Sequence, residues 1–350
     1  MTVTVAVDCG GADLGPAEVA AGAAIAAAKG VRVVLYGAQE QIGAVADGVE
    51  VVDAPISVAK DADPVRAVRA TPQASVVQAA RAVAAGDADA FVSGGSTGAA
   101  LAAGLFEVKR AHGIYRPALA TPVPIPGAPI TLLDVGANAE VRSEHLVQFA
   151  YMGAALATTV LGIERPRVAL LSNGEEASKG TPVVIEAHAQ LAAADSDALR
   201  FVGNVEGTDI ATGVADVIVT DGFTGNVTLK VLEGISQALL GAIRARATSG
   251  PRAKAGGLLL RPALRGLRDE IDPEGPGGAY LLGLRRLGVV PHGRFTRYGF
   301  SQAILLAARG VSGDVVGRTH AALEAAGALK SRPPVASGPS SGSVSSVPRG

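Results

Sequence analysis

The stretch Val168-Ala-Leu-Leu-Ser-Asn-Gly-Glu-Glu-Ala-Ser-Lys-Gly-Thr-Pro182 is the clearest guide to the fold class of this chain. Its apolar first residues are typical of a buried strand, and a polar turn bracketed by glycines follows them abruptly. Pro182 and the apolar residues after it indicate that a helix begins there. Open α/β sheets bind their ligands where a strand, a loop and a helix meet in this way. The stretch therefore predicts an α/β protein with a site at the end of this strand.

A second copy of this arrangement occupies residues 217–230, where a short apolar run is followed by Asp221, a glycine turn and Asn226. Helix and strand signals also alternate along the chain from its first residues onward. This alternation is typical of a mainly parallel sheet that helices cover on both faces, giving three layers. Two such strand–turn–helix units in one chain predict a single pocket formed by several strand ends.

Composition narrows the possible classes of function. The 350 residues are 48% hydrophobic, which is enough to bury a large core. The net charge of −1 argues against a nucleic-acid partner, because such proteins carry a strong basic excess. A single cysteine excludes an intrachain disulfide framework and fits a reducing compartment. The N-terminus lacks the pattern of a signal peptide, and no apolar run approaches the ~18 residues needed to span a bilayer, so we expect a cytoplasmic protein.

We expect residues 1–330 to form a single α/β/α domain, and the Ser-, Pro- and Gly-rich residues 331–350 to form a disordered tail. Residues 249–275 differ in composition from the rest of the chain, because arginines and leucines repeat there at helical spacing. Gly256, Gly257 and Pro262 are expected to break this segment into short pieces. It is predicted to be a helical hairpin inserted in the domain and projecting from the α/β body.

Two glycine turns are candidate anion sites. Ser93-Gly-Gly-Ser-Thr-Gly98 follows a short strand, and its backbone N–H groups and hydroxyls can cradle a phosphate. Asp8-Cys-Gly-Gly-Ala-Asp13 follows the first strand in the same way. Neither turn has the spacing of a nucleotide-binding loop, and a plain strand-to-helix turn explains each of them equally well.

Lys179 and His292 are the candidate catalytic side chains. In its turn beside Glu175, Lys179 can neutralise a phosphate or a developing oxyanion, although a solvated charge cluster is the alternative. His292 ends a strand-like run and can act as an acid or a base. The sequence shows neither metal-ligand spacing nor a serine elbow. We therefore expect no metal, no cofactor and no covalent acyl-enzyme.

Taken in order along the chain, these motifs resemble the phosphate acyltransferases of bacterial phospholipid synthesis, the acyl-acyl-carrier-protein:phosphate acyltransferase family. The resemblance covers roughly residues 3–325. The motifs that carry it include Asp63-Pro-Val-Arg-Ala-Val-Arg69, Leu133-Asp-Val-Gly-Ala-Asn138, Gly174-Glu-Glu176 with Lys179-Gly180, Phe201-Val-Gly-Asn-Val-Glu-Gly207, Asp221-Gly-Phe-Thr-Gly-Asn226 and His292-Gly293.

The resemblance implies a Rossmann-like α/β/α fold akin to phosphotransacetylases, in a homodimer. It also implies transfer of a long acyl chain from acyl carrier protein to inorganic phosphate, which gives acyl phosphate. Peripheral contact with the inner face of the cell membrane is implied as well, because the product goes to a membrane glycerol-3-phosphate acyltransferase. The resemblance implies no metal or redox cofactor.

As a hypothesis, phosphate binds the turn of residues 94–98 with Lys179 nearby and attacks the thioester directly. Asn173, Asn226 or a backbone amide holds the oxyanion, and His292 either protonates the leaving thiolate or orients phosphate. The candidate catalytic residues are Lys179, His292, Asn226 and Asn173. The candidate substrate-binding residues are Gly95, Ser96, Thr97, Gly98, Asp8, Gly11, Asp13, Asn138, Glu175 and Asp221.

Several positions depart from the family pattern. Ala70 and Thr71 stand where the family has a lysine pair, and Arg294 and Phe295 stand where it has small hydroxyl residues. Two other functions therefore stay open. One is a phosphotransacylase that uses acyl-CoA, and the other is a non-catalytic homologue that binds acyl carrier protein or membrane.

The arginine-rich residues 249–275 allow three interpretations: a surface that lies on anionic lipid, a docking site for the acidic carrier protein, or an arm that packs in a dimer. The candidate membrane or carrier-protein contacts are Leu258, Leu259, Leu260, Arg261 and Arg265.

Overall fold

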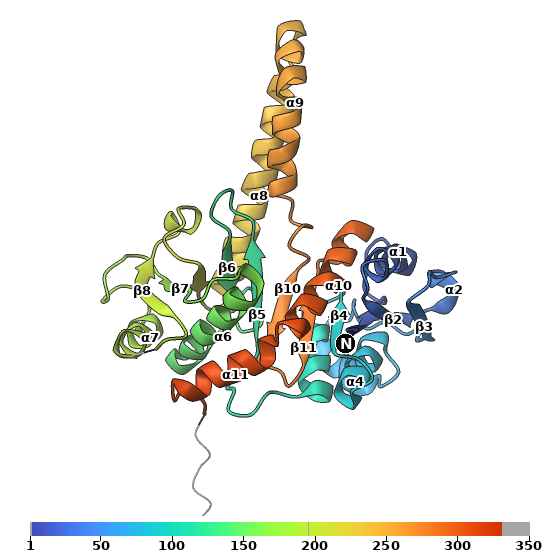
Figure 1. Cartoon of the computed structure of the whole chain (residues 1–350), viewed down its shortest axis with the longest axis horizontal. Helices are drawn as coiled ribbons and strands as arrows, with labels where there is room; N and C mark the ends of the chain where they lie inside the picture. The colour runs from blue at the N-terminus through green and yellow to red at the C-terminus, as the bar shows by residue number, and fades with distance from the viewer. Residues whose placement is uncertain (1, 195, 331–350) are drawn as a thin grey trace, which may run out of the picture.

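The computed structural model describes residues 2–194 and 196–330, so the predicted disordered tail, residues 331–350, lies outside the described residues. Eleven strands form one sheet in the order β3-β2-β1-β4-β11-β10-β5-β6-β9-β7-β8 (Figure 1). The strands are β1 (Thr4–Asp8), β2 (Arg32–Gly37), β3 (Val49–Asp53), β4 (Ala90–Ser93), β5 (Ala118–Val123), β6 (Ile130–Leu133), β7 (Arg167–Leu171), β8 (Arg200–Val205), β9 (Val217–Val219), β10 (Ala279–Leu282) and β11 (Leu287–Val290). The helices are α1 (Pro16–Ala27), α2 (Gln39–Ile42), α3 (Pro64–Ala70), α4 (Ser75–Ala85), α5 (Thr97–Ala103), α6 (Ser143–Leu161), α7 (Pro182–Ala193), α8 (Gly222–Ala247), α9 (Pro251–Glu270), α10 (Arg297–Ser312) and α11 (Val315–Ala325). A π-helical turn, Gly104–Val108, and a 3-10 turn, Asp209–Ala211, complete the regular structure.

The strands of the two halves of the sheet run in opposite directions. Strands β3, β2, β1, β4 and β11 are parallel to one another, and so are β6, β9, β7 and β8. Between these two groups lie three antiparallel pairs, β11 with β10, β10 with β5, and β5 with β6. The prediction of a mainly parallel sheet is confirmed. However, the strands of the two groups end on opposite sides of the sheet. The carboxyl ends of β4 and β11 lie along one edge, across the strand ends, while those of β6, β9 and β7 lie along the opposite one.

Helices cover both faces of the sheet, which confirms the three predicted layers. Side chains alternate between the faces along each strand. In β1, Val5 and Val7 therefore enter the core under α1, α6, α10 and α11, while Ala6 enters the core under α4 and α5. Most of both cores is aliphatic, as expected from a chain with only 3% aromatic residues.

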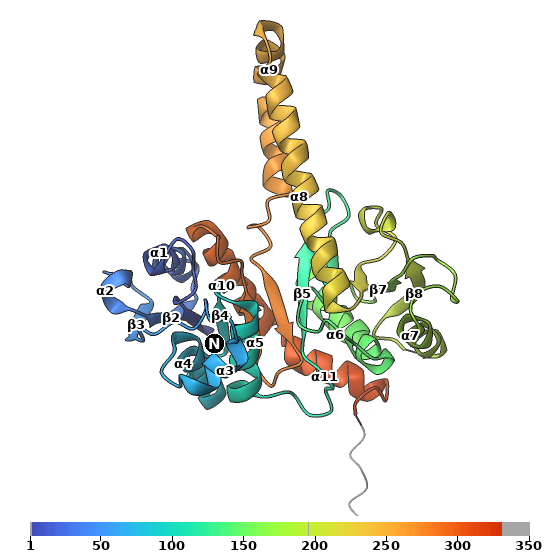
Figure 2. The same ribbon diagram turned by 180° about the vertical axis from the view of Figure 1, so that it is seen from behind.

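A helical arm projects from the body of the molecule (Figures 1 and 2). It consists of the outer part of α8 and the whole of α9, which returns beside it. The expectation that Gly256, Gly257 and Pro262 break this segment was wrong, because α9 runs unbroken through all three. Gly257 lies against Ala247 of α8: a Cβ there would come 3.1 Å from the Ala247 Cβ. This glycine therefore allows the two helices to approach closely rather than ending one of them.

Two glycines of α8 should respond to alanine with opposite signs. A Cβ at Gly225 would clash with the carbonyl oxygen of Asp134, whereas a Cβ at Gly234 meets open space. We expect Gly225→Ala to lower the free energy of unfolding by about 2 kcal/mol or more. Gly234→Ala should raise it by up to ~1 kcal/mol, because alanine is the better helix former. Urea unfolding of both variants measures the difference, and equal effects would contradict the packing described for Gly225.

Candidate active site

A cavity of about 580 Å³ lies between α8, the sheet face at β5 and β10, and the segment that follows α9. Apolar side chains form much of its lining, and they include Leu119, Val123, Leu229, Leu232, Ala279 and Phe295. Polar side chains gather elsewhere on the lining, and they include Thr97, Asn226, Lys230, Glu233 and His292. An apolar pocket with a few convergent polar groups is the usual form of a small-molecule site.

Helix α8 supplies the polar face of this cavity. It begins at Asp221, whose carboxylate accepts a hydrogen bond from the backbone N–H of Thr224 at 2.8 Å and so caps the helix. Asn226, Lys230 and Glu233 then follow at a spacing of four and three residues, which places them on one side of a helix. The Asn226 side-chain amide donates to the carbonyl of Val135 at 3.0 Å, which fixes its orientation at the cavity wall.

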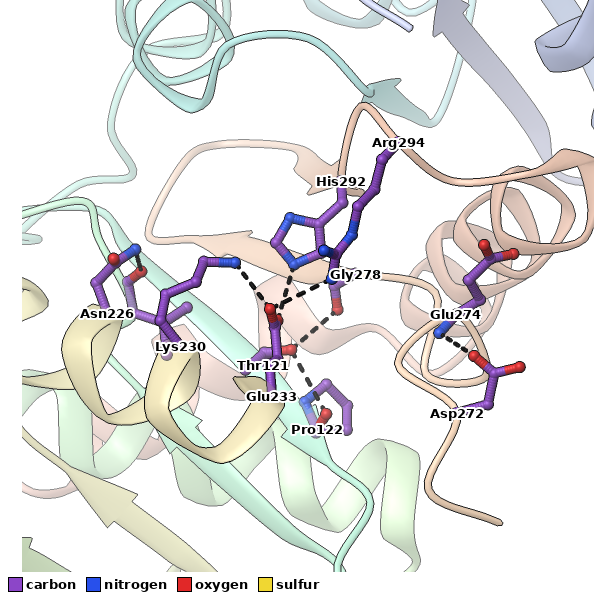
Figure 3. A network of polar contacts seen from close by, with 11 residues as sticks. Thr121, Pro122, Asn226, Lys230, Glu233, Asp272, Glu274, Gly278, His292 and Arg294 are labelled. Atoms are coloured by element: carbon purple, nitrogen blue, oxygen red, sulfur yellow. Dashed lines mark hydrogen bonds and ion pairs between the residues drawn. The ribbon is translucent and has the colours of Figure 1, made fainter. Parts of the chain in front are cut away.

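Glu233 collects three nitrogen donors around one carboxylate (Figure 3). Its Oε1 lies 3.1 Å from Nε2 of His292, and its Oε2 accepts from Nζ of Lys230 at 3.0 Å. A guanidinium nitrogen of Arg294 lies 3.4 Å from the same Oε2. Only 13% of the Glu233 side chain is exposed, against 35% for His292. Glu233 is therefore the least exposed member of the group, although it lines the cavity together with Lys230 and His292.

Burial alone would raise the pKa of Glu233, but its hydrogen bonds from His292 and Lys230 outweigh burial and hold the pKa at about 2. A carboxyl whose folded pKa lies below its unfolded value stabilises the fold above that unfolded value, here 4.5. The contribution is lost as the pH falls from about 4.5 towards about 2. Glu233 is consequently ionised throughout the neutral range.

We expect Glu233→Gln to be less stable than the unchanged protein at pH 7, and we expect the gap to close on acidification to about pH 2. The depressed pKa corresponds to an upper bound of about 3 kcal/mol, and solvent screening of the half-exposed partners reduces this to about 1–2 kcal/mol. Urea unfolding at several pH values measures the gap. A gap that does not change with pH would show that the ion pairs contribute nothing to it.

Three residues predicted from the sequence line the same cavity: Thr97, Asn226 and His292. Lys179 and Asn173 are exposed on the loop after β7 and are not among the described residues that line it. Glu175 lies exposed on that same loop. Strands β7 and β9 both end at the opposite edge of the sheet from β4 and β11. Asn226 follows β9 but stands on α8, which lines the cavity, whereas Lys179 and Asn173 stay on the loop after β7.

The two glycine turns, residues 8–13 after β1 and residues 93–98 after β4, contact one another. Gly11 and Gly95 lie in contact, since a Cβ on Gly95 would come 3.1 Å from the Gly11 Cα. The backbone N–H of Asp13 donates to the carbonyl of Gly293 at 2.8 Å, which joins the first turn to the one that carries His292. In the second turn, Ser96 caps α5 by accepting from the N–H of residue 99, Thr97 begins that helix, and Gly98 packs against Pro64.

Besides Ser96 and Asp221, which cap helices, two further predicted substrate-binding side chains are hydrogen-bonded to protein groups. The Asp8 carboxylate, 3% exposed, accepts from the hydroxyls of Ser75 at 2.6 Å and Ser93 at 2.7 Å, and burial raises its pKa. The Asn138 amide donates to the carbonyl of Pro117 and to the Asp134 carboxylate, both at 2.8 Å. The Asp8 and Asn138 side chains therefore stabilise the turns that they belong to.

Sequence reasoning missed Glu233. Its signal was available, because it is the only acidic residue between Asp221 and Asp269 and it follows Asn226 by two helical turns. In the described part of the chain, no three His, Cys, Asp or Glu side chains are grouped so that they could hold a metal ion. Nor does any described helix have the length and apolar character needed to cross a membrane.

A family model described as "fatty acid synthesis protein" matches residues 3–318. A protein from Latilactobacillus sakei named phosphate acyltransferase is 46% identical over 297 residues, 83% of this chain and 88% of that relative. The chain belongs to the phosphate acyltransferase family. A relative of the same name from Streptococcus equi subsp. zooepidemicus is 42% identical over 90% of this chain and 95% of its own length. The resemblance inferred from the motifs and the prediction of an acyltransferase enzyme are both confirmed.

Solved structures support the fold assignment. A phosphotransacetylase from Staphylococcus aureus matches with a TM-score of 0.59 at 19% identity, over 89% of this chain and 94% of that chain. A phosphotransacetylase from Streptococcus pyogenes matches with a TM-score of 0.57 at 17% identity, over the same shares of the two chains. The predicted phosphotransacetylase-like fold is thereby confirmed.

Proposed function

We propose that this protein transfers a long acyl chain from acyl carrier protein to inorganic phosphate and so forms acyl phosphate. The observation that carries the proposal is the cavity under α8, in which an apolar wall adjoins a cluster of cationic and hydrogen-bonding side chains. The names of the relatives describe acyl transfer to phosphate. One cavity with both kinds of wall suits a reaction that joins an acyl chain to an anion.

In this proposal the acyl chain lies along the apolar wall formed by β5, β10 and α8. Each methylene that leaves water there contributes about 0.8 kcal/mol. Leu229 and Leu232 of α8 face this space, as do Val123 of β5 and Ala279 of β10. The same helix that supplies Lys230 therefore also supplies part of the chain-binding surface.

Phosphate binds beside His292, Lys230 and Thr97 and attacks the thioester carbonyl directly. An O–C bond forms, Asn226 donates to the carbonyl oxygen as its charge develops, and the C–S bond then breaks. His292 takes a proton from phosphate and delivers it to the leaving thiolate. Positioning and charge neutralisation supply the rate enhancement in such a displacement, and no covalent acyl-enzyme forms.

The roles predicted for Lys179 and Asn173 remain proposals that rest on the sequence motif, since both side chains lie on the loop after β7. Lys179→Ala is expected to lower turnover by orders of magnitude while the protein stays folded. That result would support a site in which this loop also contacts the bound substrate. Turnover close to normal would remove Lys179 from the mechanism.

The proposal is tested by incubating the purified protein with palmitoyl-acyl carrier protein and phosphate, and by trapping acyl phosphate as its hydroxamate. Phosphate-dependent product is the expected result. Product from palmitoyl-CoA alone would favour the acyl-CoA phosphotransacylase. If neither thioester gives product while carrier protein still binds, the non-catalytic homologue would be favoured.

We also propose that α9 of the arm contacts the inner face of the cell membrane, where a glycerol-3-phosphate acyltransferase can take up the product. Leu258, Leu259 and Leu260 are exposed by 66%, 84% and 59% on α9. Seven arginines and lysines and no acidic residue lie between Glu233 and Asp269. Exposed leucines among cations are typical of a surface that inserts shallowly into anionic lipid.

Glutamate at both Leu258 and Leu259 is expected to abolish flotation of the protein with liposomes that contain anionic lipid. Leu14→Glu serves as the control, because Leu14 is 56% exposed and lies far from the arm in the sequence. If flotation is unchanged but turnover with acyl carrier protein falls, α9 docks the carrier protein instead.

A homodimer is proposed from a second exposed apolar surface. Residues 223, 227, 231, 235, 239 and 243 of α8 are all apolar and between 40% and 68% exposed. Each lies one turn beyond the last, so they form a continuous ridge. Monomeric proteins rarely leave such a patch uncovered. Sedimentation of Ile235→Glu, which should be monomeric if the ridge is the interface, tests this assignment.

A further inference from the structure

Glu233 connects two parts of the chain that are distant in sequence. Lys230 belongs to the same helix, but His292 and Arg294 come from the turn after β11, some 60 residues later. Asp272 and Glu274, the other carboxylates drawn in Figure 3, lie apart from this group. Among the residues in that view, Glu233 is thus the carboxylate that joins the three nitrogen-bearing side chains.

The cluster has spare donors and a net positive charge. Two cations, Lys230 and Arg294, face one carboxylate, so the group is positive even when the imidazole is neutral. An ammonium has three N–H donors and a guanidinium five, whereas Lys230 and Arg294 each make one contact with Glu233. The Lys230 and Arg294 side chains are 48% and 50% exposed, so their remaining N–H groups can reach a ligand.

We propose that Glu233 is a positioning residue that holds His292, Lys230 and Arg294 together, so that the remaining N–H groups of Lys230 and Arg294, with the second imidazole nitrogen, form a phosphate-binding site beside the cavity. The inference rests on the proposed function only in taking phosphate as the acyl acceptor. Without the carboxylate, two like charges and an imidazole would have no common partner and would separate. Glu233 itself does not touch phosphate, because like charges repel; it acts through its three partners.

A purely structural role for Glu233 predicts different kinetics. If it only fastened α8 to the turn after β11, its loss would lower thermal stability and weaken both substrates. If it positions the cluster, its loss acts on phosphate and spares the acyl donor. Glu233→Gln keeps the size of the side chain and removes the charge. Glu50→Gln is the matched control, because Glu50 also pairs with an arginine, Arg32 at 2.7 Å, on the exposed edge of the sheet.

We expect Glu233→Gln to raise the KM for phosphate by about tenfold or more, which is the effect of losing charge-assisted hydrogen bonds, and to change the KM for the acyl donor by less than about twofold. In a His292→Gln background, the same change should have a much smaller effect, because the residues act as one unit. Full additivity, or equal changes in both KM values, would overturn the inference. Glu50→Gln should behave as the unchanged protein.

Titration calorimetry with inorganic phosphate provides a readout that needs no turnover. Phosphate binding that weakens in Glu233→Gln supports the cluster even if no thioester is turned over, in which case only the proposed function fails. Unchanged phosphate binding overturns the cluster even if acyl phosphate is formed. Arg294→Gln, at a half-exposed side chain, gives a second variant in case Glu233→Gln does not fold, and it should weaken phosphate binding in the same way.

Discussion

His292→Ala is expected to lower kcat/KM for acyl phosphate formation by about 10²–10⁴-fold, the range typical of a lost acid or base. The ring sits at the cavity wall, is held through Nε2 by Glu233, and packs edge-on against Phe295 at 5.4 Å between centroids. It is therefore fixed in place, and no hydrogen bond from the described residues occupies its second nitrogen, which can take part in a proton transfer. Turnover of palmitoyl-acyl carrier protein with saturating phosphate measures the effect.

The control for this variant is His320→Ala. His320 also lies near a carboxylate, that of Glu324 at 4.0 Å, but it belongs to α11 and not to the cavity. The two variants thus remove the same side chain from two sites. A loss of less than about tenfold at His292, with the thermal midpoint unchanged, would rule out its role as the acid or base.

Ala279→Phe is expected to abolish turnover of long acyl chains selectively. Ala279 lies on β10 and lines the apolar wall, so a phenyl ring there occupies the space assigned to the chain. Excluding only four methylenes forfeits about 3 kcal/mol, or roughly 200-fold in kcat/KM. An acetyl or butyryl donor needs none of this space and should retain most of its turnover.

The short-chain donor is the internal control for Ala279→Phe, because a misfolded variant would lose both activities. The ratio of kcat/KM for palmitoyl and butyryl donors is the quantity to compare. An unchanged ratio would show that the acyl chain lies elsewhere, and the apolar wall would then need another role.

The fold class could be read from sequence because the signals are local. The polar turn after residue 171 and the capped turn at Asp221 each define a strand end and a helix start within a few residues. The three-layer arrangement follows from such units. The presence of Thr97, Asn226 and His292 at one cavity was also anticipated, since each follows a glycine turn or ends a strand.

The strand order and the remaining site residues could not be predicted, because they depend on pairing between segments that are distant in the sequence. Three antiparallel contacts around β5 and β10 reverse one half of the sheet, and no local pattern shows which strands become neighbours. Of the elements that follow strands of this half, α8 lines the cavity, whereas the loop that carries Lys179 is not among its described lining. Glu233 was missed for a similar reason, because its place in the site depends on its contact with His292, which lies 59 residues further along the chain. Gly257 was taken for a helix breaker, although its role is set by the neighbouring helix.

Helix α8 belongs to two regions at once. Its first turns carry Asn226, Lys230 and Glu233 along the cavity, and its last turns form the arm. At a rise of 1.5 Å per residue, Glu233 and Ala247 are about 20 Å apart on one continuous rod. A molecule bound to the outer end therefore contacts the same rigid helix that carries Lys230, and a small tilt of that helix would displace Lys230 relative to His292 and Arg294, which belong to the turn after β11.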